Sequence, residues 1–288
     1  MNAVGQRNPT PTKPTIDDVR EFWDANPLWQ GESQHEPGSR AFFEDHEAVV
    51  REDCFAGQLD ERIFATIKEG GRVLDLGCGN GFWLIELARR GVDDLYGADL
   101  SPNSLSLAGQ RCQIFGVEAD LSIQNAEATD FDRNSFDHVN CQGVVHHTTS
   151  PYAAVREIHA ILKPGGTCSL SVYYRNIIIR NWALLRLPSK IIHWLGGGLL
   201  GRGREAIFAQ NDVATIVRHY DGEANPIGLA YDRTEFKQLI GPGFDIEEVY
   251  FHFFPARALP FRVPRSVHGF LDRRLPFMIY ATLRKSAP

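Results

Sequence analysis

Short apolar runs alternate with longer stretches of helical periodicity through the middle of the chain. The apolar run 73–76 is followed by a helix-patterned stretch at 82–90, and the same succession repeats as far as residue 173. The strands that this pattern predicts are 73–76, 94–99, 119–124, 136–142 and 167–173. Strands separated by helices pair in parallel with right-handed crossovers. The pattern therefore predicts an α/β fold built on a doubly wound, mostly parallel sheet.

The chain on either side of this region has a different pattern. Helices are predicted before the first strand at 15–26, 41–54 and 59–68, where apolar residues recur at helical spacing. After residue 173 we predict helices at 208–220 and 234–240, a loop at 221–231, strands at 244–254 and 277–283, and a proline-rich excursion at 255–276. The predicted organisation is a disordered tail at 1–15, an N-terminal helical cap at 16–70, a core at 71–174, a helical insertion at 175–243 and the last two strands at 244–288.

Composition limits the class of protein. The 288 residues are 43% hydrophobic and 23% charged, which is typical of a soluble globular protein. No apolar run approaches the ~20 residues that a membrane-spanning helix needs, and the polar N-terminus lacks the apolar centre of a signal peptide. The five cysteines are scattered without metal-ligand spacing. We therefore expect a cytoplasmic protein with free thiols and no metal site.

Charge is distributed unevenly along the chain. Residues 1–172 hold 14 lysines and arginines against 26 acidic residues, whereas residues 173–288 hold 16 against 10. An acidic first half argues against a nucleic acid as the main partner. The basic second half favours either an anionic substrate or a membrane surface, or has no role beyond solubility.

The glycine-rich turn after the first predicted strand is the clearest candidate for ligand binding. Gly77, Gly79 and Gly81 join this strand to the following helix. Glycines let a ligand approach the backbone, and the start of a helix presents free N–H groups. Asp99 lies 20 residues beyond Gly79 at the end of the next strand, where dinucleotide-type folds place the acid that binds ribose hydroxyls. The third glycine comes one residue earlier than in the pyrophosphate-binding pattern.

Residues 60–174 resemble the class I S-adenosylmethionine (SAM)-dependent methyltransferases, including the ubiquinone and menaquinone type. The resemblance is carried by Leu-Asp-Leu-Gly-Cys-Gly-Asn-Gly at 74–81, by the paired His146 and His147 after the fourth strand, and by Leu-Lys-Pro-Gly-Gly at 162–166. It implies a seven-stranded sheet whose last strand lies antiparallel beside the fifth, with SAM as cofactor and S-adenosylhomocysteine as product. The cofactor residues that it implies are Asp75, Gly77, Cys78, Gly79, Gly81, Asp99, Leu100, Asn125, Ala126 and Gln142.

One of these residues departs from the family pattern. Asn125 stands where the family usually has an aspartate facing the adenine amino group. The amide oxygen of asparagine can still accept that hydrogen bond, and the backbone N–H of Ala126 is expected to face the ring. The carboxyl ends of parallel strands meet at one edge of the sheet, so these residues are predicted to converge there.

Methyl transfer from SAM needs a positioned acceptor and, for a hydroxyl or activated carbon, a base. His146 is the first candidate for this base and His147 the second, although a histidine pair here also occurs as a capping or packing feature. Trp23, in the N-terminal cap, is expected either to close over the site or to pack as ordinary core. The candidate substrate contacts are Trp23, Tyr173, Tyr174, Arg175, Tyr220 and Tyr231.

The insertion after the fifth strand leaves three interpretations open, because residues 173–204 contain no acidic residue. It could rest on a membrane interface, cover a pocket for an acidic substrate, or form an ordinary solvated cap. The function that the sequence predicts is methylation of a small molecule, most readily at oxygen, with nitrogen, sulfur and carbon acceptors left open. A nicotinamide-dependent oxidoreductase and a non-catalytic SAM-binding protein are the alternatives. The sequence does not decide between a monomer and a dimer.

Overall fold

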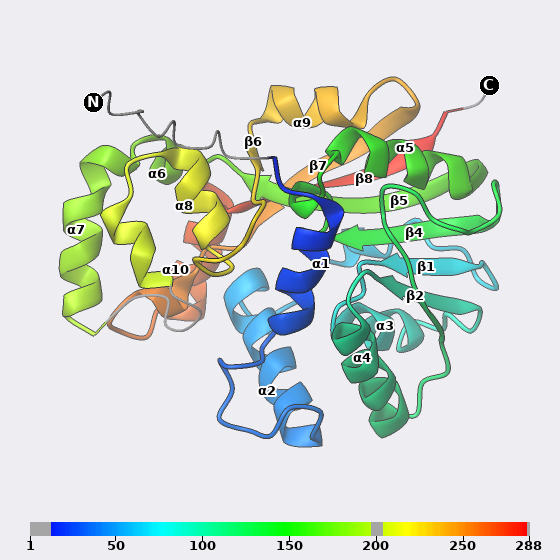
Figure 1. Ribbon diagram of the computed structural model, residues 1–288, viewed down its shortest axis with the longest axis horizontal. Coiled ribbons are helices and arrows are strands. Elements are labelled where there is room, and N and C mark those ends of the chain that lie inside the picture. Colours follow the sequence, from blue (N-terminus) through cyan, green and yellow to red (C-terminus); the bar gives the residue numbers. More distant parts are fainter. Residues whose placement is uncertain (1–12, 197–203, 287–288) are drawn as a thin grey trace, which may run out of the picture.

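A twisted, mostly parallel sheet forms the centre of the computed structural model, which describes residues 13–196 and 204–286 (Figure 1). The strand order is β3-β2-β1-β4-β5-β8-β7, and β8 runs antiparallel to both of its neighbours. The strands are β1 (Val73–Leu76), β2 (Leu95–Asp99), β3 (Asp120–Ile123), β4 (Phe136–Gln142), β5 (Leu162–Tyr174), β7 (Phe244–His252) and β8 (Met278–Lys285). The predicted fold, including the antiparallel strand beside the fifth, is confirmed.

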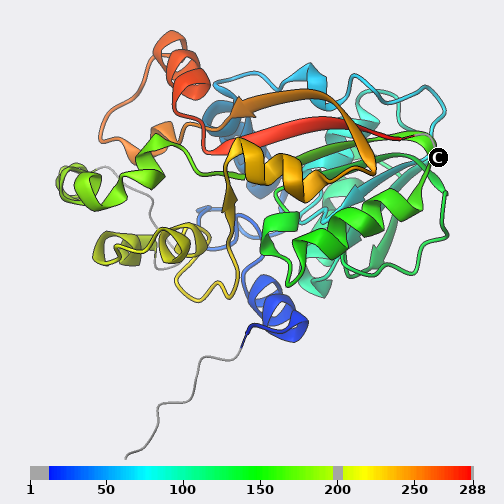
Figure 2. The same cartoon turned by 90° about the horizontal axis from the view of Figure 1, so that it is seen from above.

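Two layers of helices cover the sheet. On one face α5 (Pro151–Ile161) and α9 (Arg233–Ile240) lie side by side, as Figure 2 shows, and pack on the apolar residues of β4, β5 and β8. On the other face α3 (Phe82–Ala88) and α4 (Pro102–Phe115) pack on β1 and β2. Because α9 contributes Phe236, Leu239 and Ile240 to the main core, this helix belongs to the sheet layers rather than to a separate cap.

Local capping signals set several helix ends. Ser101 caps α4, Pro102 occupies its first turn, and Gly116 ends it in the left-handed conformation. Thr15 forms a capping box at the start of α1 (Ile16–Ala25). The predicted second helix is observed as α2 (Arg40–Val49), which continues as a π-helical turn over Val50–Cys54.

The helix predicted at 59–68 is wrong. The segment instead contains a 3₁₀ turn at Glu61–Ile63 followed by further turns. Its carbonyls, which would accept i+4 bonds in an α-helix, accept hydrogen bonds from hydroxyls of the sheet. Ser169 donates to Ile63 O (2.5 Å) and Thr167 donates to Thr66 O (3.3 Å). Apolar residues of this segment still pack in the core, so periodicity alone misidentified the backbone conformation.

The region after β5 contains elements that the sequence pattern did not predict. It begins with α6 (Ile177–Arg180) and α7 (Trp182–Trp194). The single helix predicted at 208–220 is a 3₁₀ turn at Arg204–Ala209 and a separate α8 (Val213–His219), because Asp212 caps a new helix start. The predicted loop 221–231 ends in a short strand, β6 (Ala230–Tyr231), which pairs parallel with β5. The proline-rich excursion contains a 3₁₀ turn at Ala256–Ala258 and α10 (Arg265–Arg274).

Candidate active site

The turn between β1 and α3 depends on its glycines. Gly77, Gly79 and Gly81 all have positive φ, at 77°, 53° and 80°, a region that side chains with a Cβ rarely adopt. A Cβ on Gly77 would lie 2.2 Å from Val144 Cγ2, and one on Gly81 would lie 3.1 Å from Ala108 Cα. The first glycine therefore permits the β4 exit loop to approach, whereas the third permits α3 to pack against α4.

Asp99 at the end of β2 lies directly against this turn. Its Oδ2 accepts a hydrogen bond from Gly79 N (2.8 Å), and its Oδ1 accepts one from Ser101 N (2.9 Å). Burial raises the pKa of the Asp99 carboxyl, and the backbone N–H donors act in the opposite direction. The spacing of 20 residues that the sequence shows thus corresponds to a direct contact between the acid and the glycine turn.

A cavity of about 120 Å³ lies over the carboxyl ends of β1, β2, β3 and β4. Ile16, Val19 and Trp23 of α1 line it from above, so the first helix covers the site. Seven of the predicted cofactor residues line it: Gly77, Gly79, Asp99, Leu100, Asn125, Ala126 and Gln142. Segments that are far apart in the sequence therefore meet in one cavity, which we call the cofactor cavity.

Three other predicted cofactor residues do not line this cavity. Cys78 is buried in the core between the sheet and α3, and Gly81 faces α4. Asp75 is buried beneath the turn, where its Oδ1 accepts a hydrogen bond from Asn140 Nδ2 (2.7 Å). Burial raises the pKa of Asp75 to about 7. These residues shape the turn from behind rather than facing a ligand.

Two buried oxygens near the glycine turn are unsatisfied within the described part of the chain. They are Asp75 Oδ2 and Gln142 Oε1. Gln142 is held by its amide nitrogen, which donates to Asn140 Oδ1 and to Ser169 O, both at 3.0 Å. Buried acceptors without partners are costly, and of the two residues only Gln142 lines the cofactor cavity. Gln142 Oε1 therefore has acceptor capacity for a donor of a ligand.

Asn125 makes a local contact that the sequence did not predict. Its Oδ1 accepts a hydrogen bond from Glu127 N (3.0 Å), which closes a turn after β3. The same oxygen was expected to accept from an adenine amino group. A carbonyl oxygen has two lone pairs, so the turn leaves one acceptor position on the side of the cofactor cavity.

The two histidines after β4 occupy different environments within the 3₁₀ turn Val145–His147. The side chain of His146 is 1% exposed and lines neither the cofactor cavity nor the second cavity described below. Its ring stacks between His147 and Tyr173, with centroid distances of 4.1 and 4.3 Å. Burial, together with the neighbouring His147, holds the pKa of His146 well below its usual range. His146, the first candidate for the base, is therefore placed as a neutral packing residue.

His147 faces the cofactor cavity and is held from two sides. Its Nδ1 lies 2.7 Å from Ile227 O, and its Nε2 lies 3.4 Å from Asp221 Oδ2. The Tyr173 hydroxyl donates to both oxygens of Asp221 at 2.9 Å. Because the carbonyl of Ile227 can only accept, the contact at Nδ1 requires an N–H at that nitrogen. Sequence reasoning missed Asp221, because no motif marks it in its loop.

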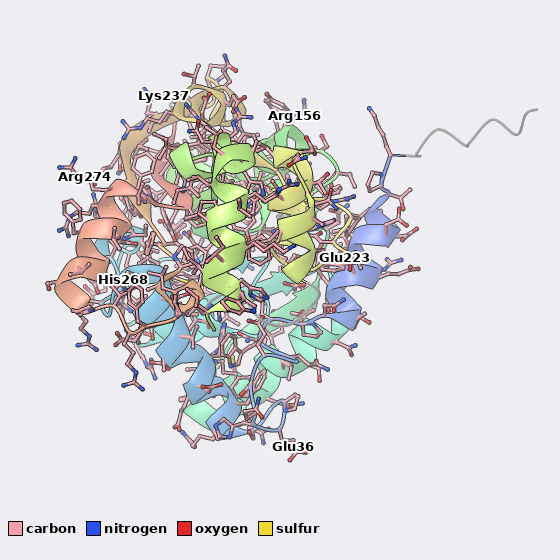
Figure 3. All side chains as sticks on the ribbon, turned by 90° about the vertical axis from the view of Figure 1, so that its left-hand side faces the viewer. Glu36, Arg156, Glu223, Lys237, His268 and Arg274 are labelled. Atoms are coloured by element: carbon pink, nitrogen blue, oxygen red, sulfur yellow. The ribbon has the colours of Figure 1, made fainter. Side chains whose placement is uncertain are left out.

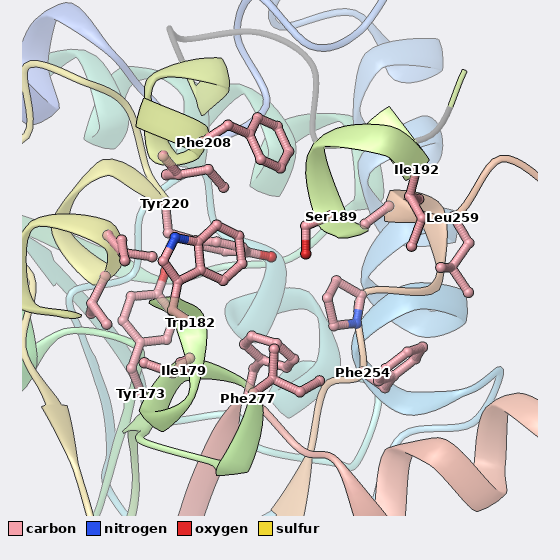
Figure 4. Close-up of a pocket in the computed structure, with 16 residues that line it drawn as sticks. Tyr173, Ile179, Trp182, Ser189, Ile192, Phe208, Tyr220, Phe254, Leu259 and Phe277 are labelled. Atoms are coloured by element: carbon pink, nitrogen blue, oxygen red, sulfur yellow. The ribbon is translucent and has the colours of Figure 1, made fainter. Parts of the chain in front are cut away.

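A second cavity of about 240 Å³, drawn in Figure 4, is bordered by Tyr173 of this cluster. We call it the acceptor cavity. Tyr173 and Tyr220 line it next to the cluster, and the remaining walls are almost wholly apolar. They come from α6, α7, the 3₁₀ turn Arg204–Ala209, α8, the segment 254–259 and the residue before β8. The side chains are Ile178, Ile179, Trp182, Ser189, Ile192, Ile207, Phe208, Ile216, Val217, Phe254, Pro255, Ala258, Leu259 and Phe277.

The other predicted substrate contacts lie elsewhere. Trp23 lines the cofactor cavity, with its ring centroid 5.0 Å from that of His147. Tyr174 packs on Phe251, and Tyr231 pairs with Tyr174 in β6. Arg175 forms an ion pair with Glu235. Tyr174, Tyr231 and Arg175 therefore hold the edge of the sheet and do not line the acceptor cavity.

Two further features bear on the chemistry. Among the described residues no group of three or more His, Cys, Asp or Glu side chains is arranged to hold a metal ion. A search of the same residues found no helix with both the length and the apolar character to cross a bilayer.

Comparison with known proteins agrees with this geometry. Residues 74–170 match a family model described as a methyltransferase domain. The ubiquinone biosynthesis O-methyltransferase of Ruegeria pomeroyi is 34% identical over 149 residues, which are 50% of this chain and 57% of that protein. The protein of the same name from Xanthomonas campestris pv. campestris is 36% identical over 119 residues, 41% of this chain and 49% of that one. The chain thus spans about half the length of the curated relatives that it matches.

A solved structure extends the likeness beyond the core. A SAM-dependent methyltransferase from Methanosarcina mazei superposes with a TM-score of 0.57 at 20% identity. The superposition covers 80% of this chain and 100% of that one. At this level of identity the likeness shows the fold alone.

Proposed function

Because the chain belongs to the class I SAM-dependent methyltransferases, we propose that it transfers a methyl group from SAM to a hydroxyl group of an uncharged, apolar small molecule. The observation that carries this proposal is the placement of two cavities on either side of the His147–Tyr173 pair. The hydroxyl is the preferred acceptor because the curated relatives named above are O-methyltransferases. Nitrogen, sulfur and carbon acceptors are the alternatives.

The residues of the cofactor cavity fit SAM. SAM supplies a methyl group on a sulfonium centre, so its leaving group needs no activation by the protein. Asp99 would hold the ribose hydroxyls, and Gly77 and Gly79 leave the backbone open to the methionyl end. The unsatisfied Gln142 Oε1, from a residue that lines the cavity, provides an acceptor beside that turn for an ammonium group.

His147 is the base in this proposal. Its Nδ1–H donates to Ile227 O, which leaves Nε2 as the nitrogen that takes the acceptor proton. The resulting imidazolium has Asp221 beside Nε2, and Tyr173 fixes that carboxylate. A positioned base of this kind contributes about 10²–10⁴-fold to a rate. The buried, neutral His146 fills the space behind His147.

The lining of the acceptor cavity argues for an uncharged acceptor. Among the described residues no lysine or arginine lines it. Burying an unpaired anion against aliphatic and aromatic walls is costly. The insertion covers a pocket, which is part of one interpretation of the sequence. That interpretation also expected an acidic substrate, for which none of the described residues lining the pocket supplies a cation. A phenol or alcohol with an apolar body fits these walls better.

Radiolabelled methyl transfer from SAM tests this proposal. We expect activity on uncharged phenols and lipophilic alcohols, and none on matched acceptors that carry a carboxylate on the apolar body. Ile216→Trp, which fills the acceptor cavity, should raise KM or abolish turnover while leaving SAM affinity unchanged. Ile123→Trp, at an exposed position on β3, is the matched control. Preferential methylation of the carboxylated series would contradict the proposal.

Single-turnover kinetics test the base. His147→Ala should slow methyl transfer to a hydroxyl by about 10²-fold or more. Asp221→Asn should also slow transfer, but less, because the imidazolium that forms loses its carboxylate partner. If His147→Ala retains the full rate at every pH, His147 is not the base.

A further inference from the structure

We propose that the outer face of α7 docks on the surface of an anionic lipid bilayer. Four large apolar side chains form one stripe along this helix, at a spacing that places them on a single face. They are Leu184, Leu187, Ile191 and Trp194, with exposed fractions of 78%, 67%, 50% and 82%. A helix on the surface of a globular protein normally places polar residues on its outer face. Here the solvent-facing stripe is apolar.

The opposite face of α7 lines the acceptor cavity. Trp182, Ser189 and Ile192 point into the acceptor cavity, as Figure 4 shows. The outer stripe is therefore not needed to complete the fold of the described residues. Contiguous exposed apolar surface of this kind marks an interaction site. Figure 3 shows α7 at the front of one side of the molecule, with nothing described lying over it.

The charge around the stripe selects the partner. Residues 173–204 contain no Asp or Glu, and Lys190 of α7 is exposed beside the stripe. On the same side of the molecule α10 carries the exposed Arg274, which is labelled in Figure 3. In a pair of copies joined through this stripe, α7 would offer no acidic side chain to Lys190 of the other copy. An anionic bilayer instead accepts the apolar side chains and attracts the cations.

The dimensions of α7 decide how it lies. A helix of 13 residues is about 20 Å long, shorter than the ~30 Å hydrocarbon layer. Since none of the described helices can span a bilayer, α7 lies in the plane of the interface. Leucine, isoleucine and tryptophan on one side with lysine at the border are the composition of such helices.

The inference has a consequence for the acceptor, which rests on the proposed function. The cavity that takes the acceptor is lined by the inner face of α7 and by segment 254–259. Phe261, 64% exposed, follows that segment. A molecule that dissolves in the bilayer would therefore reach the cavity at the edge where the protein meets the lipid.

Co-sedimentation with vesicles tests the docking without any catalytic step. The full chain should bind vesicles containing phosphatidylglycerol and should bind pure phosphatidylcholine vesicles at least about tenfold more weakly. The double variant Leu184→Ser/Ile191→Ser should lose about tenfold or more of the binding to the anionic vesicles. The matched control Ile123→Ser removes an equally exposed isoleucine, 57% exposed, from β3 at the other end of the sheet and should bind as the parent does.

The outcomes separate the proposal from its rivals. Calorimetric titration with SAM should give the same affinity for parent and double variant, so loss of lipid binding cannot reflect a damaged cofactor site. The inference is overturned if the parent ignores both vesicle types. It is also overturned by a second combination of results. In this case analytical ultracentrifugation shows that the parent and the Ile123→Ser control are dimers and the double variant a monomer, and the vesicles bind all three proteins equally. Failure to methylate any apolar acceptor bears on the proposed function and leaves vesicle binding unaffected.

Discussion

Gly77→Ala tests two reasons for a glycine at the start of the turn between β1 and α3, which are the close approach of Val144 and the positive φ. The new Cβ would lie 2.2 Å from Val144 Cγ2 and 2.8 Å from Val144 Cγ1. The residue would also hold φ at 77°, where a residue with a side chain is strained. Gly91→Ala supplies the matched control, since Gly91 has φ of 83° and a Cβ added there would meet nothing within 4 Å.

The structure supports a magnitude for each variant. The left-handed conformation costs about 1–2 kcal/mol for a residue with a Cβ, and both variants carry this cost. Overpacking against Val144 adds about 1–3 kcal/mol in Gly77→Ala alone. We therefore expect a loss of about 2–5 kcal/mol in the free energy of unfolding for Gly77→Ala and about 1–2 kcal/mol for Gly91→Ala. Val144 also lines the cofactor cavity, so Gly77→Ala should weaken SAM binding as well.

Urea denaturation and calorimetric SAM titration measure both effects. The double variant Gly77→Ala/Val144→Ala removes both γ-carbons that cause the overlap, and it should be more stable than the sum of the two single changes predicts. Equal destabilisation of Gly77→Ala and Gly91→Ala, with SAM affinity retained in both, would refute the role assigned to Val144.

Two further predictions concern stability. Glu86, 2% exposed, accepts hydrogen bonds from Arg51, Arg89 and Arg90. Glu86→Gln should therefore lower the unfolding free energy by about 1–3 kcal/mol, against about 0–1 kcal/mol for the exposed Glu248→Gln control, and equal losses contradict this. His252 lies between Asp272 and Asp60, whose carboxylate oxygens are both 2.7 Å from its ring nitrogens. Burial alone would lower the pKa of His252, but the effect of the two carboxylates is larger and raises that pKa. A raised folded-state pKa stabilises the protein fully below the unfolded value of about 6.5, and this contribution disappears as pH rises through the folded-state pKa. The stability difference between parent and Asp272→Asn should therefore shrink from pH 5.5 to pH 9 in urea titrations, and a difference that grows with pH contradicts the assignment.

Local signals explain what the sequence could predict. The strand, glycine turn and helix at 73–90 and the acid at 99 are set by short-range pattern and spacing, and the fold confirms them. The caps of α4 are equally local. Seven of the candidate cofactor residues could be placed at one edge because the carboxyl ends of parallel strands meet there.

Long-range contacts explain what the sequence could not predict. The segment 59–68 has helical periodicity, but hydroxyls of β5 take the carbonyls that an α-helix would use. In α10 the buried positions are His268 and Asp272. Because both are polar, the pattern of apolar residues did not predict this helix. Asp221 meets Tyr173 across 48 positions of the chain, and no local pattern relates the two.

The histidine pair shows a third limit. His146 and His147 are adjacent and chemically identical in the sequence. Only the 3₁₀ turn that follows β4 directs His147 to the cofactor cavity and His146 into the core. The order in which the sequence ranked them as bases is therefore reversed in the function proposed above.

Calorimetric titration of SAM against the parent chain and Asp99→Ala tests the central claim most directly. We predict binding of SAM to the parent with a Kd on the order of micromolar, no binding of NAD at the same concentrations, and loss of most of the SAM affinity in Asp99→Ala. An Asp99→Ala variant that binds SAM as tightly as the parent would contradict the claim that the carboxylate beside Gly79 holds the cofactor.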